Sequence, residues 1–169
     1  MWFALRREDL GFIARAPTVH VAEAALAAPP AAVFAALAEP RGWPRWFPNV
    51  RAARYTSPPP HGIGTIREAD VGGTDWVEEM IAWEPDARWA WTVLRASVPF
   101  ARAQVESFEL TAVPAGTRVR WTLALEPRLL ARLGAPFLGR TMRRLFERAM
   151  RNLDDVLRAG AGAAAAAGS

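Results

Sequence analysis

The sequence predicts a single α+β domain in which an antiparallel β-sheet is followed by a long C-terminal helix. Strand-like segments follow one another between residues 50 and 126, and turn residues bound each of them. No helical pattern interrupts this run, which favours an antiparallel meander over a parallel α/β sheet. After Pro127 the apolar residues recur at steps of three and four, which is typical of an amphipathic helix.

The N-terminal segments are expected to precede this sheet and to pack against it. Residues 1–17 carry apolar side chains at irregular spacing, so we expect an arm or short helix that packs on the domain. Residues 18–27 are typical of a first strand. Prolines suit the first turn of a helix, so the segment PPAAVFAALAEP predicts a short helix that ends at Glu39. A second short helix or turn, RGWPRWFP, follows.

The meander is divided by clusters of proline, glycine and small polar residues. Examples are the Gly72-Gly73 pair and the sequence Pro114-Ala115-Gly116, both of which favour tight turns. The expected strands are residues 50–57, 63–71, 75–84, 88–96, 103–113 and 117–126.

The last helix is expected to run from Phe137 to Leu157. Its apolar stripe consists of Leu138, Met142, Leu145, Ala149 and Val156, and arginines fall mostly between these positions. Pro136 is expected to separate it from an earlier helical turn that contains Leu129, Leu130 and Leu133. Residues 159–169 form a low-complexity Ala/Gly tail, which we expect to be frayed.

Composition excludes several classes of function. The chain of 169 residues has no cysteine and two histidines, so we expect no disulfide, no metal site and no cofactor. No apolar run reaches the roughly 20 residues of a membrane span, and no signal peptide is visible, so a cytoplasmic location is expected.

All 21 basic residues are arginines and alanine is abundant, which indicates a GC-rich bacterial genome. The net charge of +4 is small and no nucleic-acid-binding module is present, so we expect no nucleic-acid partner. The arginine face of the last helix suits transient contact with anionic lipid headgroups, although such faces are more often only solvated.

Side-chain alternation predicts which strand residues face inward. Trp89 and Trp91 share one face of their strand, and Trp121 shares a face with neighbouring apolar residues on another. Aromatic rings of this size can line a pocket or fill a core.

Glu106 is the acidic residue of most interest. Alternation places it on the inward face of its strand with Gln104 and Phe108, where an unpaired carboxylate would be costly. It could orient a ligand hydroxyl, act as a general base if burial raises its pKa, or form an ion pair with an arginine such as Arg102 or Arg120.

The sequence does not decide the roles of several other polar residues. Either Glu78 or Glu79 must face inward if their strand is regular, and the sequence does not decide which. Tyr55 could donate to a ligand carbonyl or pack at the sheet surface. His20 and His61 have no acid or nucleophile at the spacing of a catalytic motif.

Three segments resemble the START-like, or SRPBCC, superfamily, and most closely its polyketide cyclase/dehydrase and lipid-transport group. The stretch APPAAVFAALAEPRGWPRWFPNV resembles its opening signature, EEMIAWEPDARWAWTV its central hairpin, and GTRVRWTLALEP its last strand. The resemblance covers residues 18–158 as one domain. It implies the helix-grip fold, in which a curved antiparallel sheet of about six to seven strands wraps around the long C-terminal helix.

The resemblance also implies a cavity between the sheet and the last helix that holds a lipid, a polyketide or a similar hydrophobic small molecule. Two alternatives remain open: an enzyme resembling polyketide cyclases, in which Glu106 and Tyr55 assist enolisation and dehydration, and a protein-interaction module resembling the co-chaperone branch. The expected ligand-binding residues are Trp43, Trp46, Phe47, Trp91, Glu106, Phe108, Trp121, Met142 and Phe146.

Overall fold

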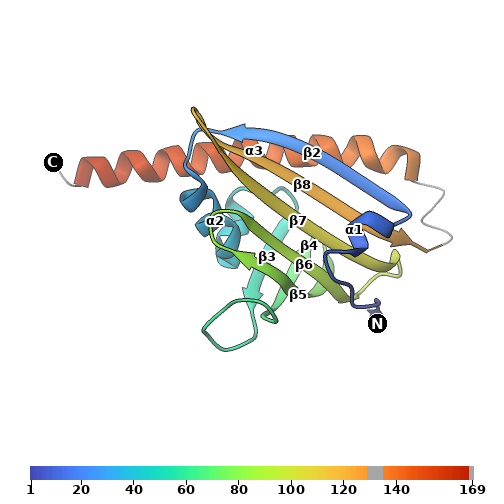
Figure 1. Ribbon diagram of the computed structural model, residues 1–169. Coiled ribbons are helices and arrows are strands. Elements are labelled where there is room, and N and C mark those ends of the chain that lie inside the picture. The colour runs from blue at the N-terminus through green and yellow to red at the C-terminus, as the bar shows by residue number, and fades with distance from the viewer. Residues whose placement is uncertain (129–134, 168–169) are drawn as a thin grey trace.

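The computed structural model describes residues 1–128 and 135–167 and confirms the predicted α+β helix-grip fold. One antiparallel sheet curves beneath the C-terminal helix α3 (Ala135–Ala167), which runs along the sheet and extends beyond it (Figure 1). The strands are β2 (Thr18–Leu26), β3 (Val50–Tyr55), β4 (Ile66–Val71), β5 (Thr74–Glu84), β6 (Arg88–Ala96), β7 (Ala101–Val113) and β8 (Gly116–Pro127), in the order β2-β8-β7-β6-β5-β4-β3.

The strands lie within three residues of their predicted bounds. The largest difference is at β4, which begins at Ile66 because the preceding residues form a turn. In this turn the amide of Thr65 donates to the carbonyl of Gly62 at 3.1 Å, and the amide of Gly62 donates to the hydroxyl of Thr65 at 2.8 Å. These bonds satisfy backbone groups that a longer strand would have paired with its neighbour.

The N-terminal arm covers the outer face of the sheet. Its short strand β1 (Phe3–Ala4) pairs with β6, and its helix α1 (Phe12–Arg15) buries Phe12 against small apolar residues of β7 and β8. Glu8 is buried and accepts from Arg6 and Arg15, each at 2.6 Å. The arm therefore closes one face of the sheet and leaves the inner face for α3.

Two short helices fill the space between β2 and β3. Helix α2 (Pro30–Ala38) buries Val33 and Leu37 completely, and the 3-10 helix η1 (Pro40–Arg45) follows it. The indole N–H of Trp43 donates to the carbonyl of Leu37 at 2.9 Å. This bond fixes the Trp43 ring against the inner face of the sheet, where it contacts further aromatic rings.

Helix α3 is longer than the sequence predicted. It continues to Ala167 instead of ending at Leu157, because the alanines of the tail favour a helix and outweigh the two helix-disfavouring glycines, Gly160 and Gly162. Pro136 lies in its first turn, where proline is tolerated. The predicted turn with Leu129, Leu130 and Leu133 lies outside the described residues.

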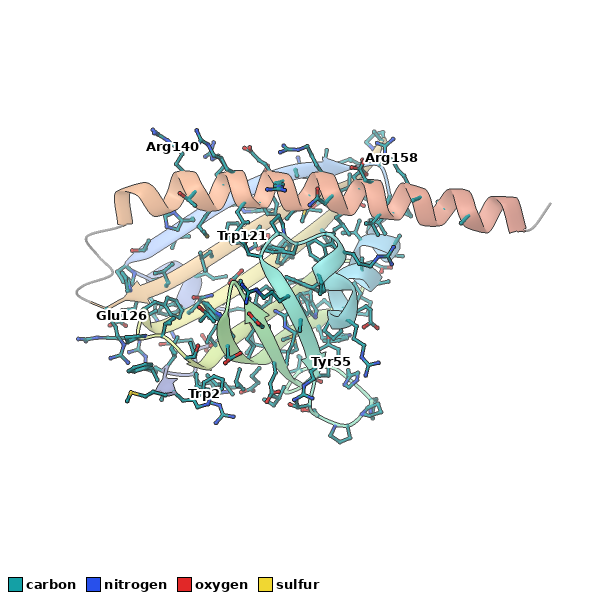
Figure 2. All side chains as sticks on the ribbon, turned by 180° about the vertical axis from the view of Figure 1, so that it is seen from behind. Trp2, Tyr55, Trp121, Glu126, Arg140 and Arg158 are labelled. Carbon is teal, nitrogen blue, oxygen red and sulfur yellow. The ribbon has the colours of Figure 1, made fainter. Side chains whose placement is uncertain are left out.

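One face of α3 packs on the sheet and the other is exposed. Phe146, Ala149, Met150 and Leu153 are buried. Arg140 projects from the side of α3 turned away from the sheet (Figure 2), and the exposed arginines of this segment are Arg140, Arg143, Arg144, Arg148 and Arg151. Within the described part of the chain, no helix combines the length and the apolar character that a bilayer span requires.

Candidate functional site

A cavity of about 330 Å³ lies between the inner face of the sheet and α3. Most of its lining is apolar, and its volume falls at the lower end of the range for small-molecule sites. We call it the central cavity. Its lining includes Trp43, Phe47, Val50, Ala53, Arg67, Ala69, Val71, Trp76, Glu78, Trp91, Phe100, Gln104, Glu106, Trp121, Leu123, Leu125, Met142 and Leu145.

An ion pair between Arg67 and Glu78 lies in the wall of the central cavity. The register of β4 and β5 sets Arg67 directly opposite Glu78, and its Nε donates to Oε2 of Glu78 at 2.6 Å. The two side chains are 2% and 5% exposed, so their charges are almost fully removed from water. Glu78 is therefore the inward member of the adjacent pair, whereas Glu79 pairs with Arg7 of the N-terminal arm.

Three tryptophans enclose the guanidinium of Arg67. Its carbon lies 4.5 Å from the ring of Trp43, 4.7 Å from that of Trp89 and 4.5 Å from that of Trp91. Aromatic faces attract a desolvated cation, so these contacts add to the attraction of Glu78. The Nη1 group of Arg67 has no hydrogen-bond partner among the described residues.

Glu106 lies on β7, between β6 and β8, and two side chains hold its carboxylate. The amide of Gln104 donates to Oε1 at 2.7 Å, and the indole N–H of Trp121 donates to Oε2 at 2.9 Å. Figure 2 shows Trp121 close beneath α3. The side chain of Glu106 is half-buried and lines the central cavity, so its surface can be reached from there.

The expected ion pair between Glu106 and an arginine is wrong. Arg102 instead lies 3.9 Å from Glu126, and Arg120 contacts Glu23 at 3.0 Å. Alternation places Arg120 on the outer face of β8. Arg102 has the same parity as Glu106, but the register between β7 and β8 shifts between Ala101 and Ala103, and Arg102 is exposed on the outer side with Glu126.

The surroundings of Glu106 raise its pKa to about 7. Burial is the largest cause, and the negative charge of Glu78 acts in the same direction. The hydrogen bond from Trp121, the positive charge of Arg67 and the hydrogen bond from Gln104 lower the pKa but do not cancel the effect of burial. A carboxyl group with this pKa can take up or release a proton near neutral pH, as a general acid or base must.

Glu106 should make stability depend on pH in a defined direction. Its pKa is about 7 in the folded protein, whereas an unperturbed glutamate titrates near ~4.3. Between these values the folded protein binds more protons than the unfolded chain, so the contribution of Glu106 to the free energy of unfolding should fall as pH rises through this window. It should be constant above roughly pH 8.

Urea unfolding of the wild type and Glu106→Gln from about pH 4 to pH 8 measures this dependence. The difference in unfolding free energy between the two proteins should change across the window. A difference that stays constant throughout would contradict the raised pKa.

Six of the nine residues expected to bind a ligand line the central cavity, and three do not. The six are Trp43, Phe47, Trp91, Glu106, Trp121 and Met142. Trp46, Phe108 and Phe146 face the interior but are fully packed. Phe108 stacks on Trp91 with ring centroids 5.9 Å apart, and Phe146 stacks on Trp121 at 5.5 Å. These rings pack between the sheet and the helices beside the cavity and leave no space for a ligand there.

Tyr55 and the two histidines do not line the central cavity. The hydroxyl of Tyr55 donates to the carbonyl of Ala38 at 2.7 Å, and burial raises its pKa. Figure 2 shows Tyr55 far from α3. His61 packs on Tyr55 with ring centroids 4.4 Å apart, and His20 lies on β2 beside Gly139 of α3. The geometry gives Tyr55 no access to a ligand beside Glu106.

Sequence reasoning missed Arg67 and did not single out the pocket roles of Trp76 and Phe100. Arg67 could have been noticed from alternation, because it shares a strand face with Ala69 and Val71, which are suited to a buried face. Among the described residues, no group of three histidine, aspartate or glutamate side chains is arranged to hold a metal ion.

A family model and a bacterial relative match most of the chain. The model for the family described as polyketide cyclase / dehydrase and lipid transport matches residues 18–158. A protein of uncharacterised function from Mycobacterium tuberculosis is 36% identical over 123 residues, which cover 72% of this chain and 74% of the relative.

Two solved structures share the fold at low identity. A START superfamily protein from Mycobacterium smegmatis is 12% identical, with a TM-score of 0.66 over 83% of this chain and 96% of its own. The Zhui aromatase/cyclase from Streptomyces sp. R1128 is 16% identical, with a TM-score of 0.64 over 83% of this chain and 92% of its own. The family's description indicates hydrophobic ligand binding. With the match over residues 18–158 and the 36% identical relative, the chain belongs to the family described as polyketide cyclase / dehydrase and lipid transport.

Proposed function

We propose that this protein binds a hydrophobic small molecule, such as a lipid or a polyketide, in the central cavity and acts as a binding or transfer protein without catalysing a reaction. The observation that carries the proposal is the apolar cavity of about 330 Å³ beneath α3. A void of this size in a folded domain forfeits packing energy. Burial of each ligand methylene there contributes up to about 0.8 kcal/mol, so a ligand would recover much of this energy.

The shape of the lining supports a ligand with an apolar body and one polar end. Leu123, Leu125 and Met142 offer aliphatic contacts, and Trp91 and Trp121 offer ring surfaces. Among the described lining residues, the polar and charged side chains are Asn49, Arg67, Glu78, Gln104 and Glu106. Small-molecule sites commonly combine an apolar lining with a few polar groups that fix the ligand's orientation.

Native mass spectrometry of the purified protein tests this proposal. We expect a fraction of the protein to carry one small molecule that organic solvent extracts, because an apolar cavity retains an apolar ligand through purification. The proposal would be contradicted by a mass equal to the bare chain, together with no binding of any hydrophobic probe by the refolded protein.

Glu106 favours a second candidate function, that of a cyclase or dehydrase. A carboxyl group with a pKa of about 7 at the wall of an apolar cavity is suited to removing a proton beside a ketone. In this case Glu106→Gln should abolish turnover of a reactive polyketone and leave its affinity within a few-fold. Equal product formation with and without the protein would contradict the enzymatic function and leave the binding function as the proposal.

A further inference from the structure

The charges that line the central cavity determine which ligands it can accept. Among the described lining residues the charged groups are Arg67, Glu78 and Glu106. Arg67 and Glu78 neutralise each other at 2.6 Å. Glu106 has hydrogen bonds from Gln104 and Trp121 but no cationic partner within the described part of the chain. When Glu106 is ionised, the charge that a ligand meets is therefore negative.

Arg67 is poorly placed to bind an anionic ligand group. Its side chain is 2% exposed, three indole rings surround it, and its Nε is committed to Glu78. A ligand carboxylate that displaced Glu78 would leave that glutamate buried without a counter-ion, which is strongly destabilising. The charge of the guanidinium is thus already balanced by Glu78, and its unpartnered Nη1 donor can serve a neutral ligand oxygen without bringing a second anion to this pair.

Glu106 can receive a hydroxyl group from a ligand. Each of its two oxygens accepts one hydrogen bond from the protein, whereas a carboxylate oxygen can accept two. The free acceptor capacity belongs to a side chain whose surface is reached from the cavity. A ligand hydroxyl would satisfy it, but a ligand carboxylate would bring a like charge close in a medium that screens poorly.

We infer that the central cavity selects hydrophobic ligands whose polar group is uncharged, such as a hydroxyl, over carboxylates of the same shape, and that Glu106 is the residue that determines this selectivity. The inference rests on the proposed function and names the chemical class of its ligand. It separates long-chain alcohols and similar neutral molecules from fatty acids.

Titration with decanol and decanoate at about pH 8 tests the inference, because the two probes share one chain and differ in charge. Tryptophan emission reports binding, since Trp43, Trp76, Trp91 and Trp121 line the cavity. We expect the wild type to bind decanol at least roughly tenfold more tightly than decanoate. Glu106→Gln should reduce this ratio to within about threefold, mainly by strengthening decanoate binding.

Glu109→Gln is the matched control. Glu109 lies on the same strand but at an outward position, beside Arg88, so its substitution should leave the ratio unchanged. A second measurement does not depend on the folding of any variant. Lowering the pH from about 8 to 6 should protonate Glu106 while decanoate stays ionised, and should strengthen decanoate binding to the wild type.

The other charged groups near Glu106 are Glu78 on β5 and Arg67 on β4, and the described lining residues of α3, Met142 and Leu145, carry no charge. Decanoate binding as tight as decanol binding at the higher pH, or a ratio that Glu106→Gln does not change, would overturn the inference and leave the proposed function intact. Failure of both probes to bind would also overturn the inference, and the proposed function would fall with it if native mass spectrometry finds only the bare chain and no other hydrophobic probe binds.

Discussion

Replacing Glu78 by glutamine is expected to lower the free energy of unfolding by about 3 to 5 kcal/mol. The variant leaves the guanidinium of Arg67 buried without its counter-ion, and this side chain is only 2% exposed. The surrounding indole rings attract the cation but carry no compensating charge. Urea unfolding at neutral pH measures the loss.

Glu79→Gln is the matched control for this variant. Glu79 is the next residue on β5 and also pairs with an arginine, at 2.6 Å, but the side chain of that partner, Arg7, is 57% exposed. Water screens such a pair, so its loss should cost about 0 to 1 kcal/mol. Equal losses in the two variants would show that burial of the Arg67 and Glu78 pair does not set its contribution.

Replacing Leu123 by tryptophan is expected to weaken decanol binding by at least roughly tenfold. Leu123 is buried on β8, lines the central cavity and pairs in register with Glu106, so the larger ring would occupy the space that a ligand needs. Because the added atoms enter a void, the unfolding free energy should fall by less than the about 1 to 3 kcal/mol of an overpacked core.

The control is Ile63→Trp, which adds an indole at a turn position that is 71% exposed and far from the lining. Its decanol affinity should match that of the wild type. If Leu123→Trp is folded and binds decanol as tightly as the control does, the ligand does not occupy the cavity.

The sheet could be predicted from the sequence because its signals are local. Turn residues such as Gly72 and Gly73 adopt positive φ angles, and they end β4 and begin β5 close to the predicted positions. The predicted end of α3 at Leu157 was wrong because a local signal was misread. Low complexity indicated fraying, but alanine favours a helix wherever one has already begun.

The inward position of Glu106 follows from alternation, and so does that of Trp121. Their hydrogen bond could not be predicted, because it depends on the register between β7 and β8. The pairing of Arg67 with Glu78 depends in the same way on the register between β4 and β5. Alternation also cannot tell a packed inward ring such as Phe108 from one that borders a void.

A crystal structure of the protein grown with decanol tests the central proposal most directly. The proposal predicts electron density for the alkyl chain along Leu123 and Leu125, with the hydroxyl within hydrogen-bond distance of Glu106. A cavity that holds only ordered water, with decanol bound elsewhere or not at all, would contradict it.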